Sequence, residues 1–406
     1  MKKLLNVLNL FSTKKEIAKK EKNWLLIVAT LSIVLSFSSC QKETTNSGAQ
    51  TDNSNLVASK VSNTEASVKV FATGLNNPRG LNWGPDGYLY VAEGGVGGTN
   101  STDGLCTQIS PPVGPYTGSA TGGRISKISS TGERTTLTDQ LPTSQTSATI
   151  GSLISGVADV EFVGSNLYAL LSGAGCTHGV ASVPNGIVKV NPDGTWSMIA
   201  NLSAWLQSHP AANPDPEDFE PDGTWYSMLS AKGYLYAMES NHQQIVRVDV
   251  STGAMTQVTD LSVTYPGETN WFGPTAAAYH GNFYIGNLGE FPIRGGASKI
   301  IKMTPDGTLK DWATGLNTIL GLVIDDHDRM YVLENTTGPT FPTFPTPGFG
   351  TVIRIDPNGN RTVIATGLNL PTGMAMGPDG KLYVSNWGFG PPPIGLGQIV
   401  QIDITH

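Results

Sequence analysis

The chain contains one strand–turn–strand segment six times, and this repeat limits the possible folds more than any other feature. Each copy is followed by a second hairpin with alternating apolar residues and Asp-Gly, Asn-Gly or Thr-Gly turns, which are typical of β-hairpins. Four strands per unit and six units predict an all-β fold, a six-bladed β-propeller. The six copies are "PRGLNWGPDGYLYVAE" (78–93), "ISGVADVEFVGSNLYALLSG" (154–173), "WYSMLSAKGYLYAMES" (225–240), "GPTAAAYHGNFYIGN" (273–287), "ILGLVIDDHDRMYVLEN" (319–335) and "PTGMAMGPDGKLYVSN" (371–386).

The last unit lacks its fourth strand, because the chain ends with "QIVQIDITH". A matching strand occurs at the other end: "SVKVFATGL" (67–75) resembles "RTVIATGL" (361–368). We therefore expect the N-terminal strand to complete the C-terminal blade, which would remove the sheet edges of an open array. The propeller domain is predicted to span 67–406.

The N-terminus has the pattern of a bacterial lipoprotein signal. Lysines between 2 and 22 precede the apolar run "WLLIVATLSIVLSF" (24–37), which is too short to span a bilayer, and "FSSC" resembles a lipobox ending at Cys40. We predict a signal peptide at 1–39, lipidation of Cys40 and a flexible polar tether at 40–66. The alternative is an uncleaved signal anchor. The expected location is the bacterial envelope, as an outer-membrane or cell-surface lipoprotein.

The charge of the mature body argues against two classes of partner. The whole chain has a formal net charge of −7, and without its first 39 residues, which hold seven Lys and two Glu, the charge is −12. Such a body has no long-range attraction for nucleic acid or for anionic lipid. We expect no nucleic-acid partner, and membrane contact only through the lipid anchor.

Several segments outside the repeat resemble one family. "TGLNNPRGLNWGPDGYLYVAE", "CTQISPPVGPYTGSATGGRISKI", "GAGCTHG" and "LPTGMAMGPDGKLYVSNWG" are similar to the ScyD/ScyE family of secreted propellers, first associated with biosynthesis of the pigment scytonemin. The resemblance covers nearly all of 67–406 and implies fold and export, but little about chemistry. Where that family has a short Asn-Pro-Tyr-Gly segment after its acidic loop, this chain has "EDFEPDGTWYS".

Long insertions are predicted on one face of the propeller. Segments 94–121, 142–153, 173–184 and 204–224 follow a second strand or join two blades, and these loops share a face, whereas tight turns occupy the other. Cys106 and Cys176 lie in two of these insertions, in adjacent blades. If Cys40 is lipidated, these two cysteines are the ones that remain, and an even number of cysteines in an exported protein favours a disulfide. We therefore predict a disulfide between Cys106 and Cys176. The alternative is two unrelated buried cysteines.

A polar residue recurs three positions after the tyrosine of the second strand, at what we expect to be the mouth of the central channel. Two interpretations are open: ligation of a divalent cation by a subset of these residues, or hydrogen bonding to neighbouring loop amides. Distantly similar hydrolases of the lactonase type hold a catalytic Ca²⁺ near such a mouth. The residues are Glu93, Glu239, Asn287, Glu334 and Asn386, with Leu171 at the equivalent position of blade two.

An acidic stretch, "NPDPEDFEPDGTW" (213–225), offers a second possible cation site. Asp218, Glu220 and Asp222 are spaced as in a calcium loop, but Leu229 stands where an EF-hand would have its bidentate Glu. The alternatives are a solvated acidic loop and a divalent-cation site. If a cation is bound, Ca²⁺ is expected, because hard oxygen ligands predominate on this face.

Catalytic motifs are largely missing from the sequence, which has no His-Glu-x-x-His, phosphate loop or Gly-x-Ser-x-Gly. His178 is the one candidate for a general base, with a loop-structuring role as the alternative. The leading hypothesis is a propeller that binds a small molecule or an envelope protein at its insertion-bearing face, and whether it is an enzyme stays open. The alternatives are a Ca²⁺-dependent lactonase or esterase and a quinone-cofactor sugar dehydrogenase.

Overall fold

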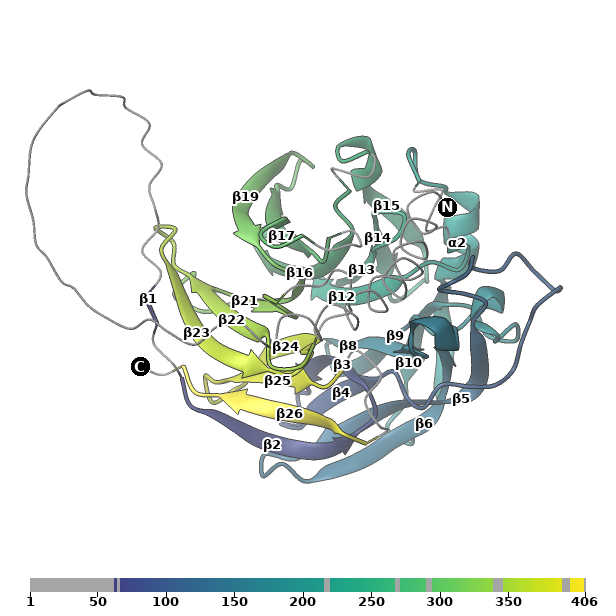
Figure 1. Cartoon of the computed structure of the whole chain (residues 1–406), viewed down its shortest axis with the longest axis horizontal. Helices are drawn as coiled ribbons and strands as arrows, with labels where there is room; N and C mark the ends of the chain where they lie inside the picture. Colours follow the sequence, from purple (N-terminus) through teal and green to yellow (C-terminus); the bar gives the residue numbers. More distant parts are fainter. Residues whose placement is uncertain are drawn as a thin grey trace, which may run out of the picture. The chain divides into compact units, whose positions relative to one another are not determined.

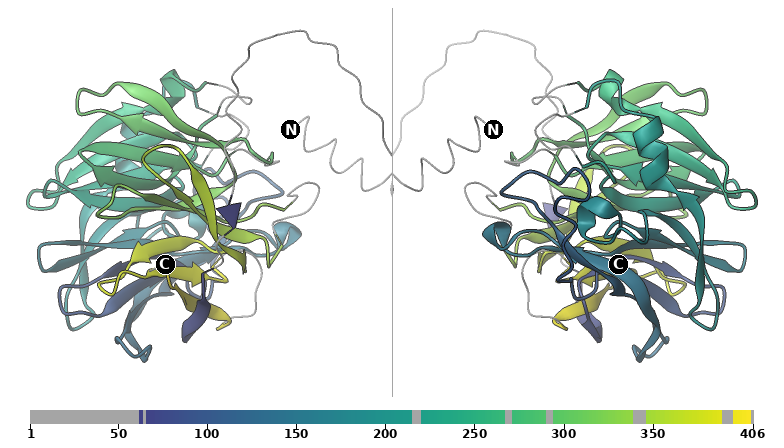
Figure 2. Two further views of the ribbon diagram at one scale, coloured as in Figure 1. Left: turned by 90° about the vertical axis from the view of Figure 1, so that its left-hand side faces the viewer. Right: turned by 90° about the vertical axis from the view of Figure 1, so that its right-hand side faces the viewer.

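Six sheets surround a central axis (Figure 1), as the repeat predicts. The computed structural model describes residues 62–63, 66–214, 220–266, 271–289, 294–338, 346–388 and 395–404. In every blade four antiparallel strands run from the axis outward, and the first strand contacts the first strands of both neighbouring blades. Edge-on views show the blades side by side around this axis (Figure 2).

The first three blades follow one another along the chain. Blade one is formed by β3 (Pro78–Trp83), β4 (Leu89–Glu93), β5 (Thr117–Ile128), β6 (Arg134–Gln145) and the short β7 (Ile154–Ser155). Blade two is formed by β8 (Val157–Val163), β9 (Asn166–Leu171), β10 (Gly186–Val190) and β11 (Trp196–Asn201). Blade three is formed by β12 (Trp225–Ala231), β13 (Tyr234–Glu239), β14 (Gln244–Asp249) and β15 (Met255–Asp260).

The last three blades complete the ring. Blade four is formed by β16 (Pro274–His280), β17 (Asn282–Asn287), β18 (Ser298–Met303) and β19 (Leu309–Leu316). Blade five is formed by β20 (Ile319–Ile324), β21 (Met330–Glu334), β22 (Gly350–Ile355), β23 (Arg361–Leu368) and β1 (Ser62–Asn63). Blade six is formed by β24 (Gly373–Met376), β25 (Leu382–Asn386), β26 (Gly397–Ile402) and β2 (Val68–Leu75).

The Leu-Tyr-Val core of each second strand follows from its position. Every residue of β4, β21 and β25 is buried, because these strands have a strand on each side and a blade packed on each face. Strands buried on both faces contain continuous rather than alternating apolar runs. The repeat that is visible in the sequence is therefore the buried second strand of each blade.

The ring closes between the two ends of the domain, as predicted. β2 pairs antiparallel with β26, from Val68 opposite Ile402 to Leu75 opposite Gly397. Leu75 is fully buried, and Val68 and Val70 remain exposed on the outer side.

Strand pairing begins earlier in the chain than predicted. Ser62 and Asn63, which fall within the expected tether, form β1 and pair in parallel with Thr362 and Val363 of β23. The backbone N–H of Ala66 then donates to the carbonyl of Ile364 at 2.8 Å. An outer strand has unpaired backbone groups, and β1 covers part of that edge. The signal peptide, Cys40 and most of the tether lie outside the described residues.

The insertions contain more regular structure than the sequence indicated. Residues 117–121 and 142–145, expected as loop, extend β5 and β6 to 12 residues each. Short helices occur at η1 (Ala148–Ile150), η2 (Cys176–His178) and η3 (Leu261–Val263). The helix α2 (Leu202–Ser208) follows blade two at the outside of the ring. Among the described residues, no helix has the length and apolarity needed to cross a bilayer.

Candidate functional site

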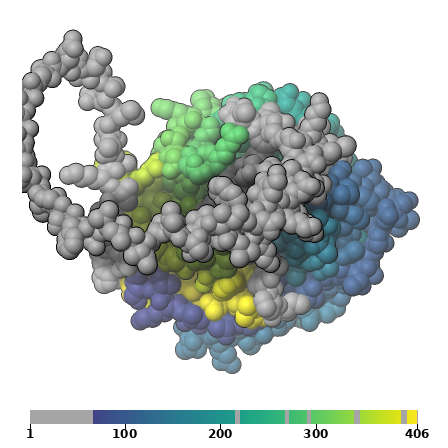
Figure 3. Space-filling view, in the orientation of Figure 1, coloured from purple at the N-terminus to yellow at the C-terminus, as the bar shows by residue number. Residues whose placement is uncertain are grey.

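The long loops of blades one to three lie on one face of the propeller. They follow a second strand or join two blades, and both kinds of loop end on the same side of a four-stranded blade. This face is turned toward the viewer in Figures 1 and 3, where the insertion of blade one (blue) forms its right-hand edge. We call it the insertion face.

A disulfide joins the insertions of blades one and two. Cys106 and Cys176 are bonded at an S–S distance of 2.07 Å, with their Cα atoms 6.3 Å apart, across 70 positions of sequence. The hydroxyl of Thr102 also donates to the carbonyl of Cys176. The predicted pairing of the two cysteines is confirmed, and it fixes the start of η2 against the blade-one loop.

Asp222 joins the insertion before blade three to the same helical turn. Its Oδ2 accepts hydrogen bonds from the backbone N–H and the hydroxyl of Thr177, at 2.9 and 2.7 Å. Asp222 is 5% exposed, and Gly175 provides the room: a Cβ there would lie 2.3 Å from the Asp222 carboxyl carbon. Asn185 donates to the carbonyls of Asp222 and Gly223 at 3.2 Å each. The carboxylate is thus part of a fixed junction between two blades.

Glu220 makes the corresponding link to blade one. Its Oε1 accepts a hydrogen bond of 3.1 Å from the hydroxyl of Tyr116, and its Oε2 accepts one from the hydroxyl of Thr224. Glu220 and Tyr116 are each 6% exposed. Of the three acidic residues proposed as loop ligands, Glu220 and Asp222 are therefore buried acceptors, and Asp218 lies outside the described residues. Residues 220–225 are buried or half-buried, so this part of the stretch is not a solvated loop, whereas 213 and 214 are exposed.

His178 stands beside these links. Its Nδ1 is 3.1 Å from the hydroxyl of Ser144, and its ring meets the Tyr116 ring edge-on with the centroids 4.7 Å apart. Burial lowers the pKa of His178 to about 4, although the nearby Asp222 acts in the opposite direction. The imidazole is therefore neutral at pH 7 and would be a weak general base. This geometry favours the loop-structuring alternative.

The polar residues three positions after the second-strand tyrosine, which we call the marker residues, accept hydrogen bonds from backbone amides. They are Glu93, Glu239, Asn287, Glu334 and Asn386. Glu93 and Glu334 accept the backbone N–H of the residue 17 positions earlier, Asn76 and Asn317, at 2.5 and 2.7 Å. The other markers make similar bonds: Asn386 accepts from Asn369 at 2.7 Å, Glu239 from Thr224 at 2.7 Å and Asn287 from Lys299 at 2.8 Å. All five are at most 3% exposed. These contacts favour the structural alternative over cation ligation.

Additional donors surround two of the marker carboxylates. Arg124 donates to both oxygens of Glu93, from Nε at 2.9 Å and from Nη2 at 2.5 Å. Burial raises the pKa of Glu334, while hydrogen bonds from Thr351 and Asn317 act to lower it. Across the described ranges, no three His, Cys, Asp or Glu side chains form a group that could hold a metal ion.

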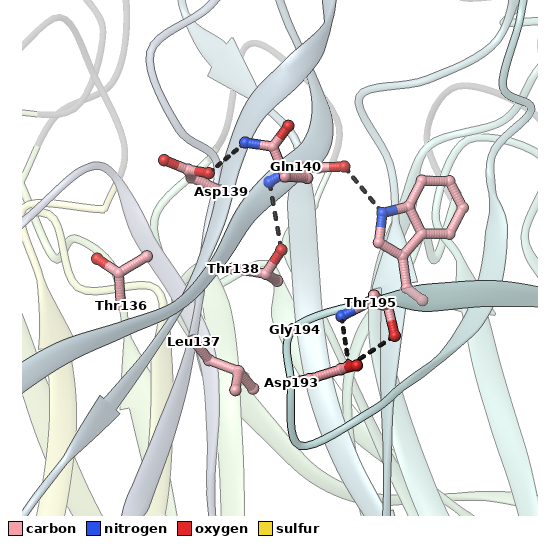
Figure 4. Close-up of a pocket in the computed structure, with 9 residues that line it drawn as sticks. Thr136, Leu137, Thr138, Asp139, Gln140, Asp193, Gly194 and Thr195 are labelled. Carbon is pink, nitrogen blue, oxygen red and sulfur yellow. Dashed lines mark hydrogen bonds between the residues drawn. The ribbon is translucent and has the colours of Figure 1, made fainter.

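A hollow of about 450 Å³ lies away from this face, between blades one and two (Figure 4). It is bounded by β6 and by the turn between β10 and β11. There the indole N–H of Trp196 donates to the carbonyl of Gln140 at 2.8 Å, and a Cβ on Gly194 would lie 2.4 Å from the carbonyl oxygen of Leu137. The hollow is thus part of the close contact between two blades.

Sequence reasoning missed Tyr116 and Asn185, two of the neutral residues that hold the junctions. Their partners are 104 and 37 positions away. The marker contacts, in contrast, had a signal in the sequence. An Asn precedes the marker by 17 positions in blades one, five and six.

Comparison with known proteins agrees with the fold. No protein-family model and no curated protein matches the chain. A calcium-binding regucalcin of Agrobacterium tumefaciens has a TM-score of 0.50 and 13% identity, over 85% of this chain and 96% of its own. A gluconolactonase of Xanthomonas campestris has a TM-score of 0.47 and 11% identity, over 83% and 89%. A Bacteroides thetaiotaomicron protein of unknown function has a TM-score of 0.48 and 12% identity, over 82% and 75%. At 13% identity, the likeness to the regucalcin shows a shared fold alone.

Proposed function

We propose that this protein is an exported, lipid-anchored β-propeller that binds a small molecule or an envelope protein at its insertion face. One observation carries the proposal. The insertions of three consecutive blades are joined into one surface by the Cys106–Cys176 disulfide and by the hydrogen bonds that Glu220 and Asp222 accept. Hairpin turns need no such connections, and long loops held by a rigid scaffold are where binding residues are usually found.

The buried carboxylates give this surface its rigidity. Removing a carboxylate from water costs several kcal/mol unless hydrogen bonds replace the lost hydration. Glu220 and Asp222 therefore favour the one loop arrangement in which Tyr116 and Thr177 can donate to them. A surface ordered before binding loses less conformational entropy when it meets its ligand.

Export is supported by three features. Disulfides form and persist in oxidising compartments such as the periplasm, so the Cys106–Cys176 bond suits an exported protein. The resemblance to the secreted ScyD/ScyE family and the lipoprotein-like signal ending at Cys40 support the same conclusion.

Photo-crosslinking tests the binding surface. We would place a benzoylphenylalanine at Leu105, which is 74% exposed in the blade-one insertion, and at Thr131, an exposed control in the opposite β5–β6 turn. Crosslinking in intact cells should give discrete adducts from position 105 and none from 131. Equal adduct patterns at both positions, or none at either, would contradict the proposal.

Lipid anchoring has a separate test. Cells grown with a labelled fatty acid should incorporate the label into the wild-type protein but not into a Cys40→Ala variant, which should leave the membrane fraction. Label in the variant, or an unlabelled wild type, would refute the anchor without affecting the binding proposal.

A Ca²⁺-dependent hydrolase of lactonase or esterase type is the second candidate. One observation favours it: Glu93, Glu239 and Glu334 end the second strands of three blades, and carboxylate oxygens are the ligands that Ca²⁺ takes. A lactone and aryl-ester screen with Ca²⁺ or chelator, together with melting curves, would decide. No turnover and a melting midpoint that Ca²⁺ does not change would eliminate this candidate.

A further inference from the structure

Two carboxyl groups lie close together where the inner strands of three blades meet. Asp159 and Glu161 are two residues apart on β8, and β8 contacts both β3 of blade one and β12 of blade three. Asp159 is 8% exposed and Glu161 is partly exposed. Strand residues two apart project to the same side of a sheet, so the two groups influence one another.

Asp159 stands out among the equivalent residues of the six blades. The pairing of first and second strands aligns it with small residues in every other blade. These residues are Gly80, Ser227, Ala276, Gly321 and Gly373. Only blade two has an acidic side chain at this level of the inner strands.

The contacts of the pair connect the three blades. Asp159 accepts the backbone N–H of Met228 on β12 through Oδ2, at 2.8 Å. On the other side a Cβ at Gly80 of β3 would lie 1.8 Å from Oδ1 of Asp159, so only glycine leaves room for this carboxyl group. Glu161 accepts from the side-chain amide of Asn82, also on β3, at 2.7 Å.

No cation balances the two carboxylates. Within the described ranges neither forms an ion pair, and the nearby Arg79 of β3 directs Nη2 to the carbonyl of Ile154 at 2.6 Å. The other titratable groups that face the pair are phenols: Tyr226 on β12, whose pKa is raised by burial and is influenced by Arg79 and Asp159, and Tyr168 on β9, opposite Glu161. On the adjoining β4 and β5, Glu93 and Arg124 form an ion pair. Lys127 of β5 forms another with Asp86, which lies in the turn between β3 and β4.

We propose that protonation of the Asp159–Glu161 pair acts as a pH-dependent clamp on the junction of β3, β8 and β12. With one proton present, the two groups can remain close while they accept from Met228 and Asn82. When that proton is lost, two uncompensated charges repel one another in a poorly solvated place. The inner strands of blades one and three then loosen around β8.

The titration properties agree with this geometry. Burial raises the pKa of Asp159 from 3.8 to about 7, and burial together with Asp159 raises that of Glu161 well above its usual value. Because the folded pKa exceeds the unfolded one, the stabilisation is complete below about pH 3.8 and is lost as the pH rises to and through about 7. Above that pH both states are ionised and the loss levels off.

Urea unfolding of the purified full chain between pH 4.5 and 8.5 tests the clamp. At each pH the unfolding constant of wild type is divided by that of Asp159→Asn, which cancels the opposite pH dependence expected from the lowered pKa of His178. This ratio should increase with pH up to about 7, by at most about tenfold per pH unit for one proton, and Asp159→Asn should be more stable than wild type at pH 8. The matched control is Asp193→Asn, at an exposed turn, which should have the same pH dependence as wild type.

Two further measurements test the clamp even if the Asp159→Asn variant does not fold. The same ratio taken with Glu161→Gln should also increase with pH, and the infrared spectrum of the wild type at pH 6 should contain the C=O band of a protonated carboxyl group, which disappears by pH 9. A ratio of wild-type to Asp159→Asn unfolding constants that stays flat or falls with pH, or the lack of that band at pH 6, would overturn the proposal.

Discussion

The hydroxyl of Tyr116 donates a hydrogen bond to Oε1 of Glu220, across 104 positions of sequence. This bond connects the insertion of blade one to the segment that leads into blade three. Blade two lies between them in the ring, and its own insertion is held by Asp222 and by the disulfide. The insertion face is therefore a connected structure that draws on three blades.

Loss of the Tyr116–Glu220 hydrogen bond should lower the stability of the protein. We expect Tyr116→Phe to lower the free energy of unfolding by about 1–3 kcal/mol, because a buried carboxylate loses a donor. Urea titration gives the value, and Tyr88→Phe at an exposed position is the control. A Tyr116→Phe variant as stable as this control would show that the bond is dispensable.

Removal of the disulfide should have a larger effect. The Cys106→Ser, Cys176→Ser double variant should lose about 2–5 kcal/mol of unfolding free energy, since the bond closes a loop of 70 positions. Limited proteolysis should then cut first within 100–116, while the six blades stay intact. Cleavage that begins in a blade instead would argue that the bond stabilises the whole fold rather than the insertions.

Substitutions of a marker carboxylate distinguish a structural role from cation binding. Glu334→Ala leaves the backbone N–H of Asn317 without its acceptor and should cost about 1–3 kcal/mol with or without Ca²⁺. Glu334→Gln, which retains a side-chain oxygen, should cost less. If the alanine variant matches wild type in chelator but no longer responds to Ca²⁺, the marker residues are a cation site after all.

Closure of the ring predicts unequal effects of two truncations. Deletion of 66–75 removes β2 and exposes the edge of β26, so the protein should aggregate. Deletion of 41–60 should change the free energy of unfolding by no more than about 0.5 kcal/mol, because it removes no described contact. Light scattering and melting curves measure both, and similar behaviour of the two truncations would contradict this closure.

The architecture could be predicted from the sequence because each repeat forms one blade. Each second strand contains a tyrosine between two apolar residues, and the matching sequences at 67–75 and 361–368 indicated how the ring closes. The disulfide followed from the two insertions that share a face. These inferences depend on local patterns, which a propeller repeats in every blade.

The site was harder to predict because its contacts are long-range and occur once. Nothing near Tyr116 or Thr177 in the sequence indicates a partner more than 40 positions away. Asp159 did have a signal, since it replaces a small residue of the other blades, but the alignment of inner strands needs their bulges, which the structure supplies. For the acidic stretch the sequence left a solvated loop and a divalent-cation site open, and neither alternative indicates that Glu220 and Asp222 are buried.

Amide hydrogen exchange in an Asp222→Asn variant tests most directly whether the three insertions are one unit. Among the described contacts, the Asp222 carboxylate accepts its hydrogen bonds from Thr177, so a purely local effect would be confined to η2 and to the peptide that carries the substitution. We predict faster exchange there and also in 102–118 of blade one, which Asp222 does not touch, with the blade strands unchanged. Faster exchange limited to 174–183 and 220–224 would contradict the account.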